Sequence, residues 1–288
     1  MTGTVHSFLP MPNRDRYPAG VPCWVDTAQP DAKAGADFYA ALFGWTIENV
    51  LPPEAPGAYF QGTIDGGRVA AVGQSPNGGP VAWCTYIAVE SADDAAQRVR
   101  EAGGTVIDEP YDVGPAGRTA NFADPEGVPF SVWQAGQHPG AEVVNGPGAW
   151  NWSSLSTADP EAAQRFYGQV FGWEFTPTEM GGSIMVRRPG YADYLESIDP
   201  GVKARHKANG APEGFTDSIA WIDPIKNGEP PAWNVTFTVP DADTAAVRAA
   251  ELGATILAEP FDVPWQRLTV IRDPQGAHLI LSQFKPRG

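Results

Sequence analysis

Apolar residues recur with a helical period in two stretches that are copies of one another. Between Asp159 and Gly172 they fall at positions i, i+4 and i+8, which is the spacing of an amphipathic helix. Asp159 suits the N-cap and Pro160 the first helical position, while Gly172 permits the left-handed turn that ends a helix. The pattern therefore predicts a helix between Asp159 and Gly172, with its copy between Asp31 and Gly44. Two further helices are expected, over residues 91–102 and 241–252.

Short runs rich in β-branched and aromatic residues separate these helices and predict strands. In the first half they cover residues 23–28, 58–64, 69–72, 83–89, 105–107, 119–122 and 128–133. Asp124, Pro125 and Gly127 fit positions i, i+1 and i+3 of a type I turn. We therefore expect the strands beside this turn to form a hairpin and the motif to be structural. Each half reads as β-α-β-β-β twice over.

The two halves of the chain form an internal repeat. The motif FYAALFGW at 38–45 returns as FYGQVFGW at 166–173, an offset of 128 residues. Trp83 and Trp233 are 150 residues apart, and the turn DPEG at 124–127 returns as DPQG at 273–276. The two halves therefore share one fold, and the second carries about 22 extra residues between Trp173 and Trp233.

Composition narrows the class of protein. The 288 residues fit two domains, and 42% hydrophobic against 18% charged residues provide a core. A net charge of −15 repels phosphate backbones, so nucleic acid is not an expected partner. No apolar run spans a membrane and residues 1–10 do not resemble a signal peptide, so we expect no membrane partner and a cytoplasmic location. Two cysteines, Cys23 and Cys84, are too few for a disulfide framework.

These motifs, in this order and twice over, resemble the vicinal oxygen chelate superfamily, the glyoxalase and bleomycin-resistance fold. More narrowly, the chain is similar to the tandem two-domain members of that superfamily described as glyoxalase-like antigens and hydroxylases. The resemblance implies an α+β protein of two glyoxalase-like domains, each an open eight-stranded barrel made of two βαβββ modules. We place an N-terminal extension at 1–19, domain 1 at 20–137, a linker at 138–146, and domain 2 at 147–286 with an inserted loop at about 187–230.

The metalloenzymes of this superfamily hold a divalent ion with His, Gln or Glu on the first strand of each module and Glu on the last strand. The resemblance maps those positions onto Trp24, Trp152, Cys84, Asn234, Ser131 and Ile280. A divalent metal site needs three or four His, Cys or carboxylate ligands, and these residues supply one thiol. We therefore predict no metal and no other cofactor.

Residues two apart on a strand share one face, and on this rule the strands present an aromatic wall with a few polar points. In domain 1 the expected ligand-facing residues are Trp24, Asp26, Cys84, Tyr86, Ser131 and Trp133, and in domain 2 they are Trp152, Ser154, Asn234, Thr236, His278 and Ile280. Such a surface suits a flat organic molecule. The alternative is that the tryptophans fill the concave interior, or cup, of each domain. Cys84 is either a small buried hydrophobe or a nucleophile.

Two residues are candidates for acid–base catalysis. A buried Asp26 needs partners or a chemical role, and desolvation that raises its pKa makes it a general base. His278 is expected to point into the second cup rather than toward solvent. The insertion, with its basic cluster and Tyr194, is a candidate lid over His278. The interpretation predicts that His278→Ala and Tyr194→Phe impair ligand binding or turnover.

Two functions fit these features. The first is a metal-independent tailoring enzyme, of lyase, isomerase or hydroxylase type, that uses acid–base chemistry on an aromatic or carbonyl-bearing natural product. The second is a non-catalytic protein that sequesters a toxic planar compound, as bleomycin-resistance relatives do. Asp26 and His278 favour the enzyme. The partner in both cases is a small molecule, and the protein is expected to be a monomer or homodimer.

Overall fold

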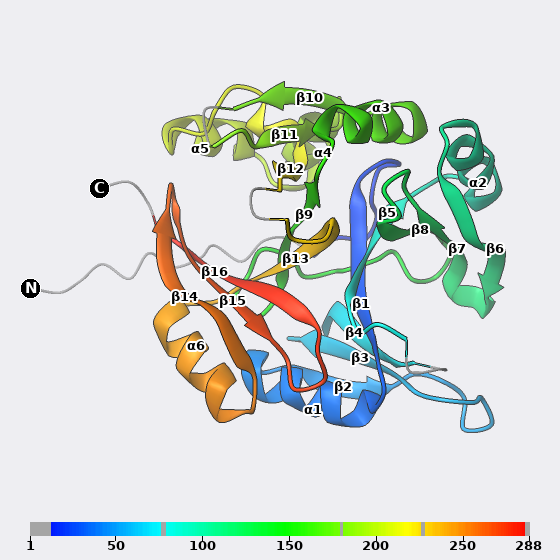
Figure 1. Ribbon diagram of the computed structural model, residues 1–288, viewed down its shortest axis with the longest axis vertical. Coiled ribbons are helices and arrows are strands. Elements are labelled where there is room, and N and C mark those ends of the chain that lie inside the picture. Colours follow the sequence, from blue (N-terminus) through cyan, green and yellow to red (C-terminus); the bar gives the residue numbers. More distant parts are fainter. Residues whose placement is uncertain (1–12, 76–78, 179–180, 226–227, 286–288) are drawn as a thin grey trace, which may run out of the picture.

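The computed structural model describes residues 13–75, 79–178, 181–225 and 228–285. Two eight-stranded sheets with helices make up the fold (Figure 1). The elements of the first half are β1 (Pro22–Gln29), α1 (Ala32–Phe43), β2 (Thr46–Asn49), β3 (Tyr59–Ile64), β4 (Gly67–Gln74), β5 (Trp83–Ala88), α2 (Ala92–Glu101), β6 (Thr105–Val113), η1 (Gly114–Ala116), β7 (Gly117–Ala123) and β8 (Pro129–Ala135). Those of the second half are β9 (Trp150–Thr157), α3 (Pro160–Phe171), β10 (Glu174–Pro177), β11 (Ile184–Arg187), α4 (Tyr191–Ile198), α5 (Val202–Ala208), η2 (Phe215–Asp217), β12 (Ser218–Pro224), β13 (Ala232–Thr238), α6 (Ala242–Glu251), β14 (Thr255–Val263), β15 (Gln266–Arg272) and β16 (His278–Phe284).

Both sheets have the same strand order. The first runs β2-β3-β4-β1-β5-β8-β7-β6 and the second β10-β11-β12-β9-β13-β16-β15-β14. In the first, β1 lies parallel to β4 and antiparallel to β5, and β5 lies parallel to β8. Each sheet is therefore two βαβββ modules joined at their first strands. The predicted α+β fold of two glyoxalase-like domains is confirmed, and both sheets are open.

The repeated helices begin and end as their sequence predicts. The Asp31 carboxylate accepts a hydrogen bond from the Ala34 amide at 2.9 Å, and Asp159 accepts one from Ala162 at 2.9 Å. These side chains satisfy amides that the first turn of a helix leaves without partners. Gly44 and Gly172 end the helices with φ of 77° and 68°, the left-handed conformation that glycine adopts without steric cost.

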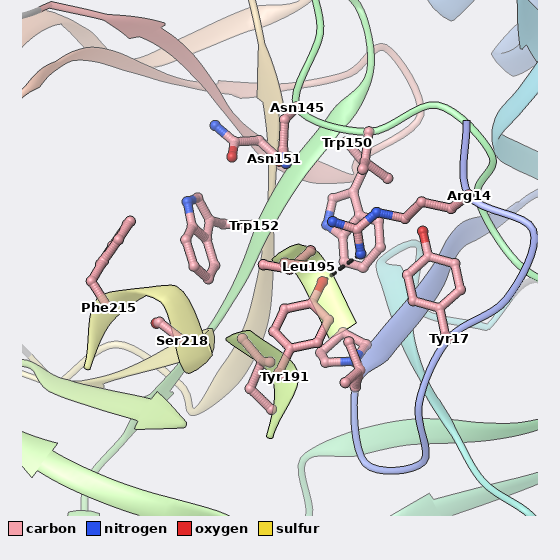
Figure 2. A pocket seen from close by; sticks show the side chains of 14 residues that line it. Arg14, Tyr17, Asn145, Trp150, Asn151, Trp152, Tyr191, Leu195, Phe215 and Ser218 are labelled. Carbon is pink, nitrogen blue, oxygen red and sulfur yellow. Dashed lines mark hydrogen bonds between the residues drawn. The ribbon is translucent and has the colours of Figure 1, made fainter. Parts of the chain in front are cut away.

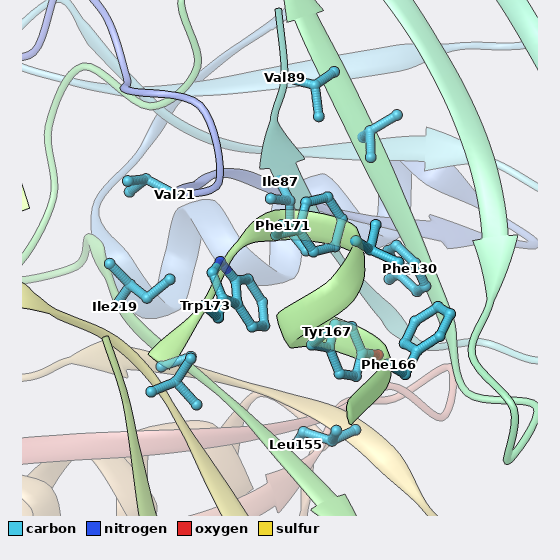
Figure 3. Close-up of a cluster of buried hydrophobic side chains, with 14 of the residues drawn as sticks. Val21, Ile87, Val89, Phe130, Leu155, Phe166, Tyr167, Phe171, Trp173 and Ile219 are labelled. Carbon is cyan, nitrogen blue, oxygen red and sulfur yellow. The ribbon is translucent and has the colours of Figure 1, made fainter. Parts of the chain in front are cut away.

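The hydrophobic cores are shared between the two domains. One core joins α2, β7 and β8 of the first domain to α3, β11 and β12 of the second. The other joins α1 and β4 to α6, β13 and β16. Figure 3 shows Phe130 of β8 beside Phe166, Tyr167 and Phe171 of α3, and the ring centres of Phe130 and Tyr167 are 5.6 Å apart. Each module of one domain is thus covered by the opposite module of the other, with α1 beside α6 and α2 beside α3 (Figure 1).

The tryptophans of the repeated FGW motif form hydrogen bonds between the two domains. Trp45 Nε1 donates to the Gly148 carbonyl at 2.8 Å, and Trp173 Nε1 donates to the Gly20 carbonyl at 2.6 Å. Both acceptors lie just before the first strand of the opposite domain. A buried indole N–H needs such a partner. The repeat therefore contributes equivalent contacts from both sides of the interface.

The segment expected to be an inserted loop contains three short helices and a strand of the sheet. Residues 187–230 contain α4, α5, η2 and the strand β12, which pairs in parallel with β9 as β4 pairs with β1. The true insertion therefore lies between β11 and β12. Tyr191, Leu195 and Val202 are buried in the core that it shares with α3, so burial of its apolar face orders the insertion. Among the described residues, no helix has the length and apolar character needed to cross a membrane.

Candidate functional site

Strand register places the predicted polar and aromatic residues of domain 1 on one face of the sheet. Trp24 of β1 pairs with Tyr86 of β5, and Tyr86 pairs with Ser131 of β8. In the next row, Asp26 pairs with Cys84. Residues two apart along a strand share a face, so the side chains of all five lie together. We call these five residues, with Tyr59 of β3, the Asp26 cluster.

The Asp26 carboxylate accepts hydrogen bonds from two phenols. Tyr59 Oη donates to Oδ2 at 2.9 Å and Tyr86 Oη donates to the same atom at 3.0 Å. Trp24 Nε1 in turn donates to Tyr59 Oη at 3.0 Å. Burial raises the pKa of Asp26 to about 6, because desolvation outweighs the two hydrogen bonds that lower the pKa. This carboxyl therefore changes its protonation state close to neutral pH.

A second chain of hydrogen bonds runs from Cys84 across the same face. Cys84 Sγ lies 3.1 Å from Ser131 Oγ, Ser131 Oγ donates to Asn121 Oδ1 at 2.6 Å, and Asn121 Nδ2 donates to Asp108 at 2.8 Å. Burial, aided by the Asp26 charge, raises the pKa of the Cys84 thiol to about 12. Nucleophilic cysteines react as thiolates, so Cys84 is a protonated, space-filling member of the cluster.

His138 covers one side of the cluster. Its ring packs edge-on against Trp24, with ring centres 4.6 Å apart, and its Nε2 lies 3.1 Å from Gln61 Nε2. Trp133 Nε1 donates to the His138 carbonyl at 2.8 Å. Burial, followed by the nearby Arg68 charge, lowers the pKa of His138 to about 4. The imidazole is therefore neutral at physiological pH.

The corresponding face of domain 2 has no carboxyl group among the residues at equivalent register. Trp152 pairs with Thr236, and Thr236 with Ile280, while Ser154 pairs with Asn234. Ser154 therefore occupies the position of Asp26. Asn234 donates to Ser156 at 2.9 Å, and Trp152 lies near Trp221, with ring centres 6.4 Å apart. The two domains share a fold but present different chemistry on this face.

Two expectations for domain 2 need correction. His278 is the first residue of β16, lies opposite Arg272 and is exposed, so the prediction that its imidazole points away from solvent is wrong. A strand end at the rim of an open sheet is reached by water from several sides. Tyr194 donates its hydroxyl to the Arg16 carbonyl at 2.6 Å. It therefore joins α4 to the N-terminal segment, and the insertion is a packed helical layer rather than a loop poised over His278.

Sequence reasoning missed three members or neighbours of the cluster. Tyr59 and Gln61 lie in a run recognised as a strand, and their alternation placed them on the same face, although only strand pairing shows that this face meets Asp26. His138 was assigned to the linker. It reaches the cluster because the chain after β8 folds back, with the Gly140 amide donating to His138 Nδ1 at 3.1 Å. No local pattern signals that return.

The metal site of related metalloenzymes does not fit these residues. The central row across domain 1 is Trp24, Tyr86 and Ser131, which is not a donor set for a divalent ion. Within the parts of the chain that the structure describes, no three His, Cys, Asp or Glu side chains are grouped so that they could hold a metal.

Two family models match the chain, one on each domain. Residues 24–132 match the Glyoxalase/Bleomycin resistance protein/Dioxygenase superfamily, and residues 152–282 match the Glyoxalase-like domain. The protein is a tandem glyoxalase-fold protein and belongs to this superfamily.

Individual relatives match over nearly the whole chain. It is 35% identical to putative glyoxylase CFP32 of Mycobacterium tuberculosis over 96% of this chain and 98% of that protein. It is 36% identical to anthracycline biosynthesis protein DnrV of Streptomyces peucetius over 91% of this chain and 92% of that protein.

Solved structures support the fold. The Mn(II)-bound glyoxalase from Novosphingobium aromaticivorans matches with a TM-score of 0.59 and 16% identity, covering 93% of this chain and 83% of that chain. Catechol 2,3-dioxygenase matches with a TM-score of 0.56 and 11% identity, covering 94% and 90%. At this identity the likeness extends to the fold and not to the chemistry.

Proposed function

We propose that this protein is a metal-independent enzyme that performs acid–base chemistry on a planar, carbonyl-bearing aromatic molecule at the Asp26 cluster of domain 1. The observation that carries the proposal is the Asp26 carboxyl itself. It is held by two phenols, its pKa is raised to about 6, and it lies among aromatic rings. A perturbed carboxyl in such surroundings is typical of a general base.

The chemistry that suits this arrangement is proton abstraction next to a carbonyl group. The Asp26 carboxylate takes a proton from the carbon beside the carbonyl, and the electron pair of that C–H bond moves into the carbonyl to give an enolate. Protonated Asp26 then returns the proton to the same or another atom of the substrate. The net change is an isomerisation, or an elimination if a leaving group departs, and no external oxidant or reductant is needed.

The two phenols tune the base. Hydrogen bonds from Tyr59 and Tyr86 stabilise the charged carboxylate, while burial favours the neutral acid. The balance leaves a base that is ionised at pH 7 and still has appreciable proton affinity. General bases work best when their pKa lies near the operating pH.

The ligand class follows from the rings around the carboxyl. Trp24, Tyr59 and Tyr86 bring their rings to Asp26, with Trp133 close to the neighbouring His138 ring. The similarity to proteins named for anthracycline biosynthesis supports the same class, because anthracyclines are planar polycyclic ketones. Aromatic walls bind such molecules by offset or edge-on packing.

A hydroxyanthraquinone that carries an acetyl group is a suitable probe. In D₂O, abstraction of the acetyl hydrogens replaces them with deuterium, which mass spectrometry measures without knowledge of the natural substrate. We expect the protein to accelerate this exchange and Asp26→Asn to lower the rate by about 100-fold or more. Asp37→Asn is the matched control, because Asp37 is an exposed partner of Lys33 on α1. The rate should rise with pH through about 6 and then level off.

A non-catalytic binding protein is the alternative, favoured by the rings of Trp24, Tyr59 and Tyr86 that surround Asp26. The same probe separates the two functions. Quenching of tryptophan fluorescence on binding, with no deuterium uptake above the buffer rate, supports sequestration and rejects the enzyme. Deuterium uptake that Asp26→Asn leaves unchanged also rejects the proposed site.

A further inference from the structure

A pocket away from the Asp26 cluster lies where the N-terminal segment, the linker and α4 meet (Figure 2). It has a volume of about 100 Å³. Arg14 and Tyr17 come from the segment before β1, Asn145 from the linker, and Trp150 and Tyr191 from β9 and α4. None of the residues of the Asp26 cluster lines it.

Arg14 brings a buried positive charge to this pocket. The side chain is 7% exposed, and its guanidinium donates to the Tyr191 hydroxyl and lies over the Tyr17 ring, 5.2 Å from the ring centre. Figure 2 shows the guanidinium directed at the Tyr191 hydroxyl, with their hydrogen bond dashed. Among the residues that the structure describes, no carboxylate forms an ion pair with Arg14. A buried charge normally requires an opposite charge nearby.

Two more polar groups of the pocket lack partners. Trp150 Nε1 and Ser218 Oγ are buried without any hydrogen bond to the described residues, and both residues line the pocket at 5% exposure. Buried donors in native proteins are almost always satisfied. The pocket is thus lined by an N–H, an O–H and the free edge of a guanidinium. These donors suit a hydrogen-bond acceptor that carries a negative charge.

We propose that this pocket binds a small monocarboxylate, with the carboxylate on Arg14. A guanidinium offers paired N–H donors that match a planar carboxylate. A single arginine balances one negative charge, whereas a phosphate dianion requires more cations than this lining supplies. The volume of about 100 Å³ is that of roughly three water molecules at liquid density, which fits an acid the size of acetate or propionate. The ligand bridges the N-terminal segment and α4, so its binding stabilises their contact.

Sodium acetate and sodium propionate are the probes. Thermal unfolding and isothermal titration should show saturable binding and a rise in Tm beyond that in sodium chloride of equal ionic strength. Arg14→Gln should weaken binding by about tenfold or more. Arg16→Gln, an exposed arginine on the same segment outside the pocket, should leave it within about twofold. Trp150→Phe, which removes the N–H donor together with one ring of the indole, should weaken binding about fivefold.

Three results would overturn the proposal. The first is a Tm response to acetate no larger than the response to chloride. The second is tighter binding of inorganic phosphate than of either carboxylate, which would assign the pocket to a different anion. The third applies if the Arg14→Gln protein does not fold. In that case, unchanged affinity for acetate in both Trp150→Phe and Ser218→Ala would show that the carboxylate does not bind in this pocket.

Discussion

Tyr39 of the first domain donates its phenolic proton to Asp273 of the second domain at 2.7 Å. Tyr167 makes the equivalent bond to Asp124 at 3.1 Å in the opposite direction. Each aspartate is the first residue of a repeated DPxG turn and uses its other oxygen to accept amide hydrogen bonds within that turn. The two strongest sequence motifs of the repeat therefore meet across the domain interface rather than within one domain.

Loss of either phenol should destabilise the whole chain. Each phenol accepts from a buried tryptophan, Trp83 for Tyr39 and Trp233 for Tyr167, and donates to an aspartate. Removing the hydroxyl leaves both groups without that partner, at a cost of about 2–3 kcal/mol. We expect Tyr39→Phe and Tyr167→Phe each to lower the free energy of unfolding in urea by this amount. Tyr111→Phe, at an exposed position, should change it by less than about 0.5 kcal/mol, and equal effects at all three sites would contradict the interface role.

Asp26 should make the stability of the protein fall as pH rises from about 4 to above 6. Its folded-state pKa of about 6 exceeds the value of 3.8 expected when unfolded, so the folded protein holds an extra proton in this window. Asp26→Asn removes the dependence. The variant should therefore gain stability relative to the parent between pH 4 and 7.5, by at most about 3 kcal/mol. Urea unfolding of the variant and the parent at pH 4 and pH 7.5 measures this gain. A difference in unfolding free energy that is the same at both pH values would show that the carboxyl is not desolvated.

His138 should act in the opposite direction. Its folded-state pKa of about 4 lies below the unfolded value of 6.5, so the unfolded chain binds the extra proton between these values. Stability attributable to His138 is lost as pH falls from about 7 to 4, by at most about 3 kcal/mol. His138→Gln should flatten this part of the profile. NMR titration of the imidazole is the direct measurement, and a pKa near 6.5 would refute the buried, neutral ring.

Acid–base chemistry should depend on domain 1 and not on His278. Because His278 is exposed at a strand end, His278→Ala should change the deuterium exchange of the anthraquinone probe by less than about twofold. Asp26→Asn should lower it by about 100-fold. The reverse order of effects would move the working site to the second domain.

Activity should survive removal of metal ions. The central row of the cluster offers no donor set for a divalent ion, so elemental analysis of the purified protein should find far less than one Zn, Mn or Fe per chain. Exchange of the probe should be equal before and after dialysis against a chelator. Stoichiometric metal whose removal abolishes exchange would refute the proposal.

Local patterns determined the elements and the repeat. Asp159, Pro160 and Gly172 defined α3 because caps act within one turn, and the duplicated FYxxxFGW motif implied two copies of one fold. Alternation along β1 and β5 also put Trp24, Asp26 and Tyr86 on a common face, because side-chain direction in a strand has a period of two.

Contacts between distant segments were decided only by the tertiary structure. Strand pairing places Tyr59 beside Asp26, and the return of the chain after β8 places His138 over the cluster. The insertion forms the helices α4 and α5 because its apolar face packs against the core. The sequence also did not show that Tyr39 donates its hydrogen bond to Asp273 of the opposite domain. Such contacts depend on which apolar faces pack against one another. The pattern of one segment indicates that one of its faces is buried, but it does not indicate which other segment covers that face.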